Sequence, residues 1–247
     1  MLKPAMLLTK LRRARLSSLP AHRFAILFCF LLLSITVYPY AESSARGYYA
    51  FRVLGSVIIL LTVYAVSFRR NLVILLFCLA VPALLERILL SPSDSGAAAL
   101  VNRLLSVTFD AVVLAIIFRR VYAEESPTSE TIFGALSIYL LLGFVFASIY
   151  GLIVSVQPNA FVLDPLSNLH RVPDRFDFIY FSFGTLTELG APGIAAVSRE
   201  VRSVSLLEAV LGIFYLAVLI SRLMSTYRAA AGTAQAVSTD SQPPLSS

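Results

Sequence analysis

Tryptophan is absent from this chain, histidine occurs only twice, and charged residues make up only 14% of the sequence. Soluble domains carry about 25% charged residues, so the shortage argues against an ordinary soluble fold. The two cysteines, Cys29 and Cys78, lie inside apolar runs, far from a second cysteine or a histidine at metal-ligand spacing. Catalytic Ser/His/Asp and Cys/His sets are also missing from the sequence. The sequence therefore predicts no enzyme activity, no cofactor and no resident metal.

Apolar residues dominate instead, at 58% of the chain with a mean hydropathy of +0.82. The formal net charge is +6, but the basic residues cluster at the ends of apolar segments, so membrane orientation explains them better than nucleic-acid binding does. These residues are Lys3, Lys10, Arg12, Arg13, Arg15, Arg23, Arg69, Arg70, Arg119, Arg120, Arg222 and Arg228. The positive-inside rule then places both termini in the cytoplasm.

Six apolar runs are long enough for membrane helices, which need about 20 such residues. They are Phe24 to Tyr40, Tyr49 to Phe68, Asn71 to Leu90, Ala98 to Phe118, Ile132 to Val156 and Ser203 to Leu223. A seventh run, from Phe176 to Thr187, is too short to cross. The pattern predicts an all-α membrane protein with six transmembrane helices and a re-entrant pore helix and filter loop between the fifth and the sixth.

The same pattern divides the chain into five parts. These are a basic cytoplasmic N-terminus (1–23), a four-helix transmembrane domain (24–120), a linker (121–131), a pore domain (132–224) and a disordered cytoplasmic tail (225–247). The acid-free N-terminal segment also fits a transit peptide or an interfacial amphipathic helix. The tail is small, polar and proline-containing, so it offers little apolar area to bury.

The loop after the short apolar run has the composition of an ion pathway. Thr185 and Thr187 end the run, and the negative end of the helix dipole would there point at the membrane centre, where it favours a cation. Gly190 and Gly193 add the backbone freedom that carbonyl coordination of an ion requires. Non-helical backbone is tolerated at membrane depth only inside protein or beside a water-filled cavity.

Residues 129–223 resemble the pore module of the potassium channel pore-loop superfamily, in particular bacterial six-span members that carry no ligand domain. FDFIYFSFGTLTELG resembles the pore helix, SREVRSVSLLEAVLGIFYLAVLISRL the inner helix, and SETIFGALSIYLLLGFVFASIY the outer helix. The resemblance implies a homotetramer in a bacterial inner (plasma) membrane that conducts cations passively. It also implies that Gly212 is the gating hinge of the inner helix.

The selectivity filter departs from this family. Without gaps, the family filter Thr-Val-Gly-Tyr-Gly-Asp falls on Glu188, Leu189, Gly190, Ala191, Pro192 and Gly193. Proline is fixed at a φ of about −65° and lacks an N–H, whereas the family has a glycine with positive φ at the position of Pro192. We therefore expect a broken carbonyl ladder and weak potassium selectivity.

Glu188 stands where the family has the threonine that lines the innermost ion site. Four copies would form a ring of carboxylates, a device of cation channels, so the ring predicts a permeant cation near Glu188 and block or permeation by divalent cations. The alternative is that the Glu188 carboxylate turns back and accepts hydrogen bonds from the backbone or from Thr185 and Thr187.

Charged residues inside the first four spans are few. A voltage sensor needs several basic residues at every third position, and the fourth span has only Arg103, so we expect no steep voltage dependence. Arg103 and Glu86 are predicted to form a salt bridge toward the external side. Asp110 lies near the middle of the fourth span without an obvious partner, and Glu208 is expected to pack behind the filter.

Three hypotheses follow. The first is a homotetrameric cation channel in the lipid bilayer, permeable to monovalent or divalent cations. The second is a non-conducting, channel-like subunit that assembles with other channel chains, favoured by Ala191 and Pro192. The third is a six-span protein of another activity whose loop only resembles a pore.

Overall fold

The computed structural model describes residues 22–42, 53, 55–60, 62, 74, 78, 80–81, 96–123, 128–164 and 173–240. Its elements in these ranges are α2 (Arg23–Glu42), α5 (Ala97–Tyr122), α6 (Ser129–Val156), β1 (Phe161–Leu163), α7 (Arg175–Leu186), β2 (Ile194–Ala196) and α8 (Arg199–Asp240). The prediction of a mainly helical chain is confirmed. The predicted second and third spans lie largely outside the described residues, and Glu86 lies there too.

Two helices in the described part of the chain are long and apolar enough to cross a membrane, and they match the predicted fifth and sixth spans. They are α6 and the Arg199–Met224 part of α8. A shorter apolar helix covers Arg23–Val37, and α5 coincides with the predicted fourth span. The other spans stay predictions.

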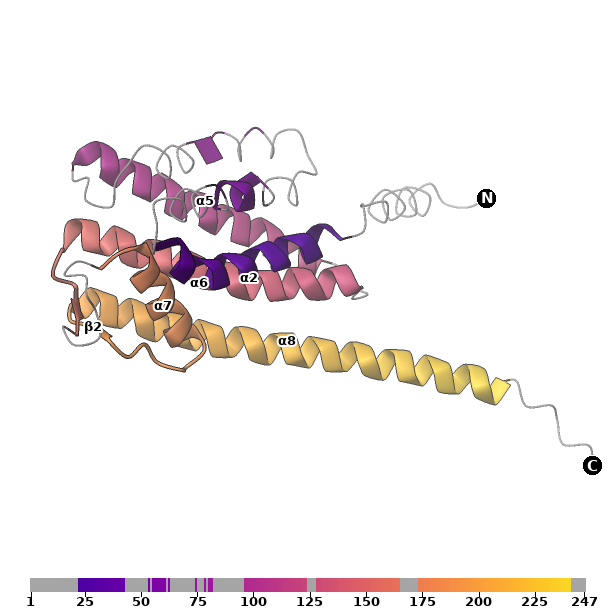
Figure 1. Cartoon of the computed structure of the whole chain (residues 1–247). Coiled ribbons are helices and arrows are strands. Elements are labelled where there is room, and N and C mark those ends of the chain that lie inside the picture. The colour runs from indigo at the N-terminus through magenta and orange to yellow at the C-terminus, as the bar shows by residue number, and fades with distance from the viewer. Residues whose placement is uncertain are drawn as a thin grey trace, which may run out of the picture.

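Helix α6 is the centre of the packing, since it contacts α2, α5, α7 and α8 (Figure 1). It begins at a capping box in which the Thr128 hydroxyl accepts from the Thr131 N–H at 3.3 Å. Its apolar side chains belong to two clusters. One cluster joins α6 to α2 and α5, and the other joins it to α7, β1 and β2.

The structure corrects the sequence prediction at two places. The chain is not purely α-helical, because β1 and β2 pair, and three-residue strands are too short to give an alternating pattern that the sequence would reveal. The predicted disordered tail is also wrong over residues 225–240, where α8 continues. Five alanines between residues 229 and 236 explain the continuation, since alanine has the highest helix propensity.

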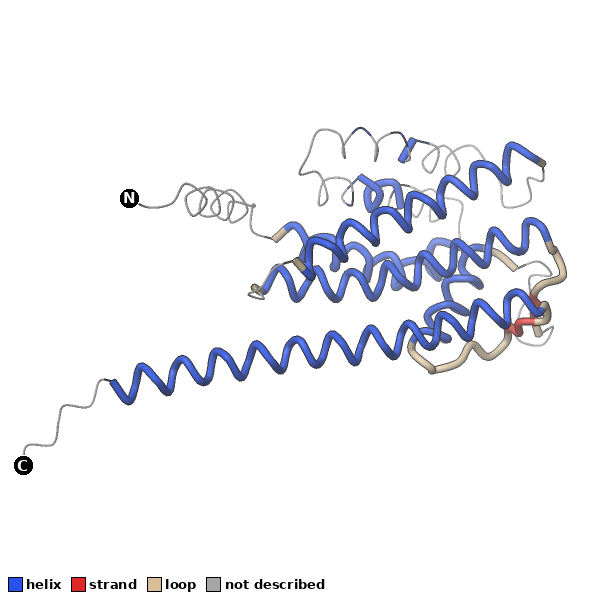
Figure 2. Tube along the Cα trace, turned by 180° about the vertical axis from the view of Figure 1, so that it is seen from behind, coloured by secondary structure: helices blue, strands red, loops and turns tan. Residues whose placement is uncertain are grey.

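The antiparallel pair β1–β2 joins the exit of α6 to the start of α8. Its register places Phe161 opposite Ala196 and Leu163 opposite Ile194. The pairing is extended by the Asp164 N–H, which donates to the Gly193 carbonyl at 2.9 Å. Figure 2 shows the loop after α7 returning along α8 to this strand pair. The helix α7 and the loop therefore run in opposite directions within one end of the bundle.

Figure 1 also shows which elements lie at each end of the bundle. Helix α2 begins at the end of the bundle toward which α8 runs, and α8 extends well beyond the other helices. The strand pair lies at the opposite end. The turn after α7 is thus separated from the strand pair by the length of the returning loop.

Candidate functional site

Helix α7 starts at a capping box. The Asp174 carboxylate accepts from the N–H groups of Phe176 at 2.7 Å and Asp177 at 3.0 Å, and the Asp177 carboxylate accepts from the Asp174 N–H at 2.9 Å. Two acids at a helix N-terminus also complement the positive end of the dipole. The Asp-x-x-Asp spacing is a sequence signal for this helix start, and the prediction of the short apolar run does not include it.

Aromatic packing holds α7 against α6 and β1. The Phe181 ring makes edge contacts with Tyr150 and Phe161 at centroid distances of 5.1 and 4.9 Å. The Phe161 ring also contacts Phe178 at 5.5 Å. Edge-to-face contacts of this kind are the preferred geometry of aromatic pairs. Tyr150 is fully buried in this packing.

The C-terminal end of α7 is fixed by hydrogen bonds to its own backbone and to α6. The Thr185 and Thr187 hydroxyls donate to the carbonyls of Phe181 at 2.8 Å and Phe183 at 2.6 Å. The Tyr139 hydroxyl of α6 donates to the Leu186 carbonyl at 3.0 Å. Each threonine hydroxyl therefore donates its proton within α7, and only the lone pairs of the hydroxyl oxygens remain available.

Glu188 follows the helix with a φ of 59°, in the left-handed region. Its N–H donates to the Thr185 carbonyl at 3.2 Å, so it occupies the helix-terminating position that glycine usually takes. The side chain is exposed. Within the described residues its carboxylate accepts no hydrogen bond, so the turned-back arrangement is not the one adopted in this chain.

The loop beyond Glu188 does not present a ladder of carbonyls. The Ile194 N–H donates to the Ala191 carbonyl at 3.3 Å, and Gly193 has a φ of 90°, so Pro192 and Gly193 are the central residues of a type II turn. The Gly193 carbonyl is taken by Asp164. The Pro-Gly pair was a turn signal in the sequence.

Gly190 holds the first half of the loop against α7. Its N–H donates to the Gly184 carbonyl at 3.0 Å, and its own carbonyl oxygen would lie 2.5 Å from a Cβ added to Gly184. This leaves the carbonyls of Glu188, Leu189, Gly190 and Pro192 without a backbone N–H partner among the described residues. Leu189 is 83% exposed. Glu188 and Leu189 are thus both exposed at this turn.

Gly212, the predicted hinge, lies where α8 meets the end of α7. A Cβ at this position would come within 2.9 Å of both the Leu186 carbonyl oxygen and the Leu186 Cδ1. Helix α8 continues without interruption through Gly212. Close approach of the two helices accounts for the glycine, and its role as a hinge stays a prediction.

Glu208 lies behind α7, as expected. It is fully buried on α8 and hydrogen-bonds the Tyr150 hydroxyl of α6 at 2.6 Å and the Ser182 hydroxyl of α7. The Ser182 hydroxyl also lies 2.7 Å from the Gly143 carbonyl of α6. Three helices thus meet at one carboxyl group. Sequence analysis missed the two hydroxyl partners, because 58 and 26 residues separate them from Glu208 along the chain.

Two charged residues of α5, Arg103 and Asp110, have partners on α6. The Arg103 guanidinium donates to the Ser155 hydroxyl, and the Ser148 hydroxyl donates to the Asp110 carboxylate at 2.9 Å. The predicted partner of Arg103, Glu86, lies outside the described residues. A serine hydroxyl of α6 is therefore one partner of each of these two charges.

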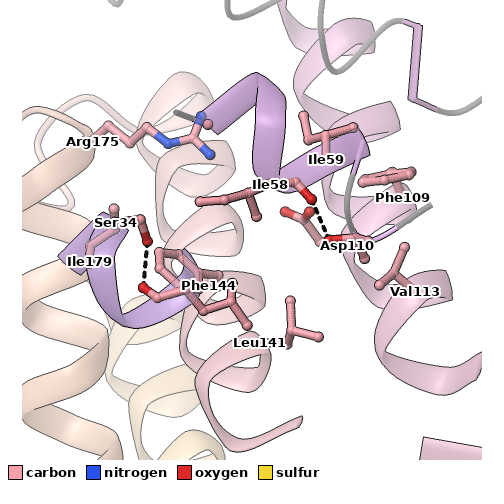
Figure 3. A pocket seen from close by; sticks show the side chains of 13 residues that line it. Ser34, Ile58, Ile59, Phe109, Asp110, Val113, Leu141, Phe144, Arg175 and Ile179 are labelled. Carbon is pink, nitrogen blue, oxygen red and sulfur yellow. Dashed lines mark hydrogen bonds between the residues drawn. The ribbon is translucent and has the colours of Figure 1, made fainter. Parts of the chain in front are cut away.

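A cavity with about 50 Å³ of space lies between α2, residues 55–62, α5, α6 and the N-terminal half of α7. Figure 3 shows Asp110 and Arg175 among the side chains that surround it, with Ser34 and several apolar residues. The space is large enough for one water molecule, and Asp110 of α5 and Arg175 of α7 both border it.

No protein-family model, curated protein or solved structure matches the chain.

Proposed function

We propose that the chain is one subunit of a homotetrameric cation channel of the potassium-channel pore-loop type, with six membrane spans and a re-entrant α7 and loop. Two features of the fold support it. The 12 residues of α7 span about 18 Å at about 1.5 Å per residue, roughly half of a hydrocarbon core of about 30 Å. The loop then returns along α8 (Figure 2).

The observation that carries the proposal is the placement of Glu188. A non-glycine residue in the left-handed region costs roughly 1–3 kcal/mol, and an acid at a helix C-terminus faces the negative end of the dipole. Both destabilising effects apply to Glu188, whose side chain is exposed and whose carboxylate accepts no hydrogen bond in the described part of the chain. A residue that stability disfavours twice is best explained by a requirement for its charge.

Four copies of this arrangement would surround one axis with carboxylates. The C-terminal end of each α7 and the open Leu189 carbonyl add negative potential at the same place. Because the Ala191 and Gly193 carbonyls are engaged elsewhere, side chains rather than a carbonyl ladder would select the ion. We expect cation conduction with weak potassium preference, and block or permeation by divalent cations.

One chain cannot close such a pore, and α8 carries an apolar face that the described residues leave uncovered. Leu207, Val210, Leu211, Phe214 and Val218 are each at least 39% exposed. Their spacing of three, four and seven residues places them in one stripe along the helix. Neighbouring copies and lipid together would cover this stripe in the membrane.

The second candidate is a non-conducting, channel-like subunit that assembles with other channel chains. The type II turn at Pro192 and Gly193 favours it, because it removes the carbonyl ladder of the resembled family. This candidate shares the tetrameric architecture, so only conduction separates the two.

The test is ion flux into proteoliposomes containing purified protein, measured for potassium, sodium and calcium. We expect flux of monovalent cations that calcium inhibits or accompanies. Glu188→Gln should raise the calcium concentration for half-inhibition about tenfold or more, since it removes the charge and keeps the size. Glu200→Gln is the matched control, because Glu200 is an exposed acid in the first turn of α8, and we expect it to leave calcium block unchanged.

Two outcomes would contradict the channel. A folded tetramer without flux would favour the non-conducting subunit, and a monomer of confirmed mass in mild detergent would exclude both. Equal effects of Glu188→Gln and Glu200→Gln would remove Glu188 from the ion path.

A further inference from the structure

We propose that Glu208 is a neutral, proton-carrying carboxylic acid at neutral pH, and that its proton completes a hydrogen-bond chain that positions α7 between α6 and α8. The inference concerns a group that the proposed ion path does not contact. It rests on counting protons in the buried contacts of Glu208, and it holds whether or not the chain conducts.

Three oxygen–oxygen contacts meet at this point. Tyr150 Oη lies 2.6 Å from Glu208 Oε2, Ser182 Oγ lies within hydrogen-bond distance of Glu208 Oε1, and Ser182 Oγ lies 2.7 Å from the Gly143 carbonyl oxygen. Each contact needs one proton between its two oxygens. The tyrosine and serine hydroxyls supply only two.

An ionised Glu208 would therefore leave one contact without a proton. The Ser182 hydroxyl can donate to the Gly143 carbonyl or to the carboxylate, but not to both. The unfilled contact would set two acceptor oxygens against each other in the protein interior. A proton on Glu208 Oε1 resolves this, because Glu208 donates to Ser182, Ser182 donates to Gly143, and Tyr150 donates to Glu208 Oε2.

The surroundings support the neutral form. Glu208, Tyr150 and Ser182 are all fully buried. Both side chains that hydrogen-bond Glu208 carry uncharged hydroxyl groups, and burying a carboxylate without a cationic partner is strongly unfavourable. The proton thus removes the charge and fills the missing contact at once.

The chain of hydrogen bonds makes Glu208 a positioning residue for α7. Ser182 lies on the middle of α7, four residues before Leu186, whose carbonyl contacts α6 and α8. Fixing Ser182 between Glu208 and Gly143 sets the depth of α7. That depth in turn sets where Glu188 emerges.

The direct test is infrared difference spectroscopy of wild type against Glu208→Gln at neutral pH. A protonated carboxylic acid gives a C=O stretching band that a carboxylate lacks, and we expect the variant to lose one such band. Asp110→Asn is the matched control, because Asp110 is a partly buried acid whose carboxylate accepts a hydrogen bond from a serine hydroxyl. This variant should leave that band in place. A loss of carboxylate bands only in Glu208→Gln would overturn the inference.

A second measurement separates the hydrogen-bond chain from simple packing. Glu208→Gln presents an amide that donates to Ser182 and accepts from Tyr150, so its melting temperature should stay within about 2 °C of wild type. Glu208→Leu should fall by about 5 °C, because the buried Tyr150 hydroxyl loses its acceptor and the Ser182 hydroxyl, which still donates to Gly143, loses its donor. Equal melting temperatures for both variants would contradict a positioning role. A protein that shows the acid band but passes no ions keeps this inference and rejects the proposed channel.

Discussion

Glu188 and Gly212 lie at the same end of α7 and are held there by opposite kinds of constraint. Glu188 has a backbone conformation that glycine would adopt without strain, so packing does not explain its side chain. Gly212 has ordinary helical backbone, and the Leu186 carbonyl leaves no space for a Cβ. Function is therefore the better explanation at residue 188, and packing at residue 212.

Gly212→Ala tests the packing explanation. Alanine gains up to about 1 kcal/mol of helix propensity, but its Cβ would overlap a backbone oxygen at 2.9 Å, and overpacking costs about 1–3 kcal/mol. We expect a net loss of about 1 kcal/mol, seen as a lower melting temperature. Gly151→Ala is the matched control, because its Cβ would meet Phe178 at 3.6 Å, an ordinary contact, so this variant should be as stable as wild type or more so. Equal stabilisation of both would show that α7 and α8 are not in tight contact.

Among the elements, α7 depends most on its ends. It has only 12 residues, and isolated helices of that length are marginal. The capping box holds its first turn. At its last turn the Tyr139 hydroxyl donates to the Leu186 carbonyl and the Gly190 N–H donates to the Gly184 carbonyl. The aromatic contacts hold its side. Loosening either end should therefore destabilise the whole helix.

Asp174→Ala should loosen the first turn of α7. It removes the acceptor for two N–H groups, at an expected cost of about 1 kcal/mol. Hydrogen–deuterium exchange of the amides of residues 176 and 177 should speed up by about fivefold, while the amides of α6 stay unchanged. Asp174→Asn keeps a cap acceptor and should stay close to wild type. Unchanged exchange in Asp174→Ala would show that the capping box does not hold α7.

Part of this element was predictable from sequence, and part was not. The half-length apolar run gave α7 to within one residue at each end, because a short helix between polar segments is a local signal. The Asp174 cap and the Pro192–Gly193 turn were also local signals, and they went unused. The strand pair and the Ser182–Glu208–Tyr150 contacts depend on how segments far apart in the chain come together, which spacing alone does not determine.

For the whole molecule, the question is what covers α8. Helix α6 is enclosed by four other helices, whereas the apolar stripe of α8 from Leu207 to Val218 is exposed in the described part of the chain. In a membrane, lipid covers apolar side chains as well as protein does, so association depends on close packing. If four copies meet along α8, truncating its stripe should weaken the tetramer more than truncating an exposed stripe elsewhere.

The double variant Leu207→Ala/Phe214→Ala tests this arrangement. It removes two large side chains, exposed by 54% and 63%, that lie seven residues apart on one face of α8. Loss of packing at an interface should cost about 2 kcal/mol or more in each subunit. Native mass spectrometry should then show wild type at four times the 27.0 kDa chain mass and the variant dissociating at lower detergent concentration.

The control Leu100→Ala/Leu104→Ala removes two exposed leucines from one face of α5 and should leave the tetramer intact, because that face would meet lipid. Equal dissociation of both variants would place the contact between copies elsewhere than along α8.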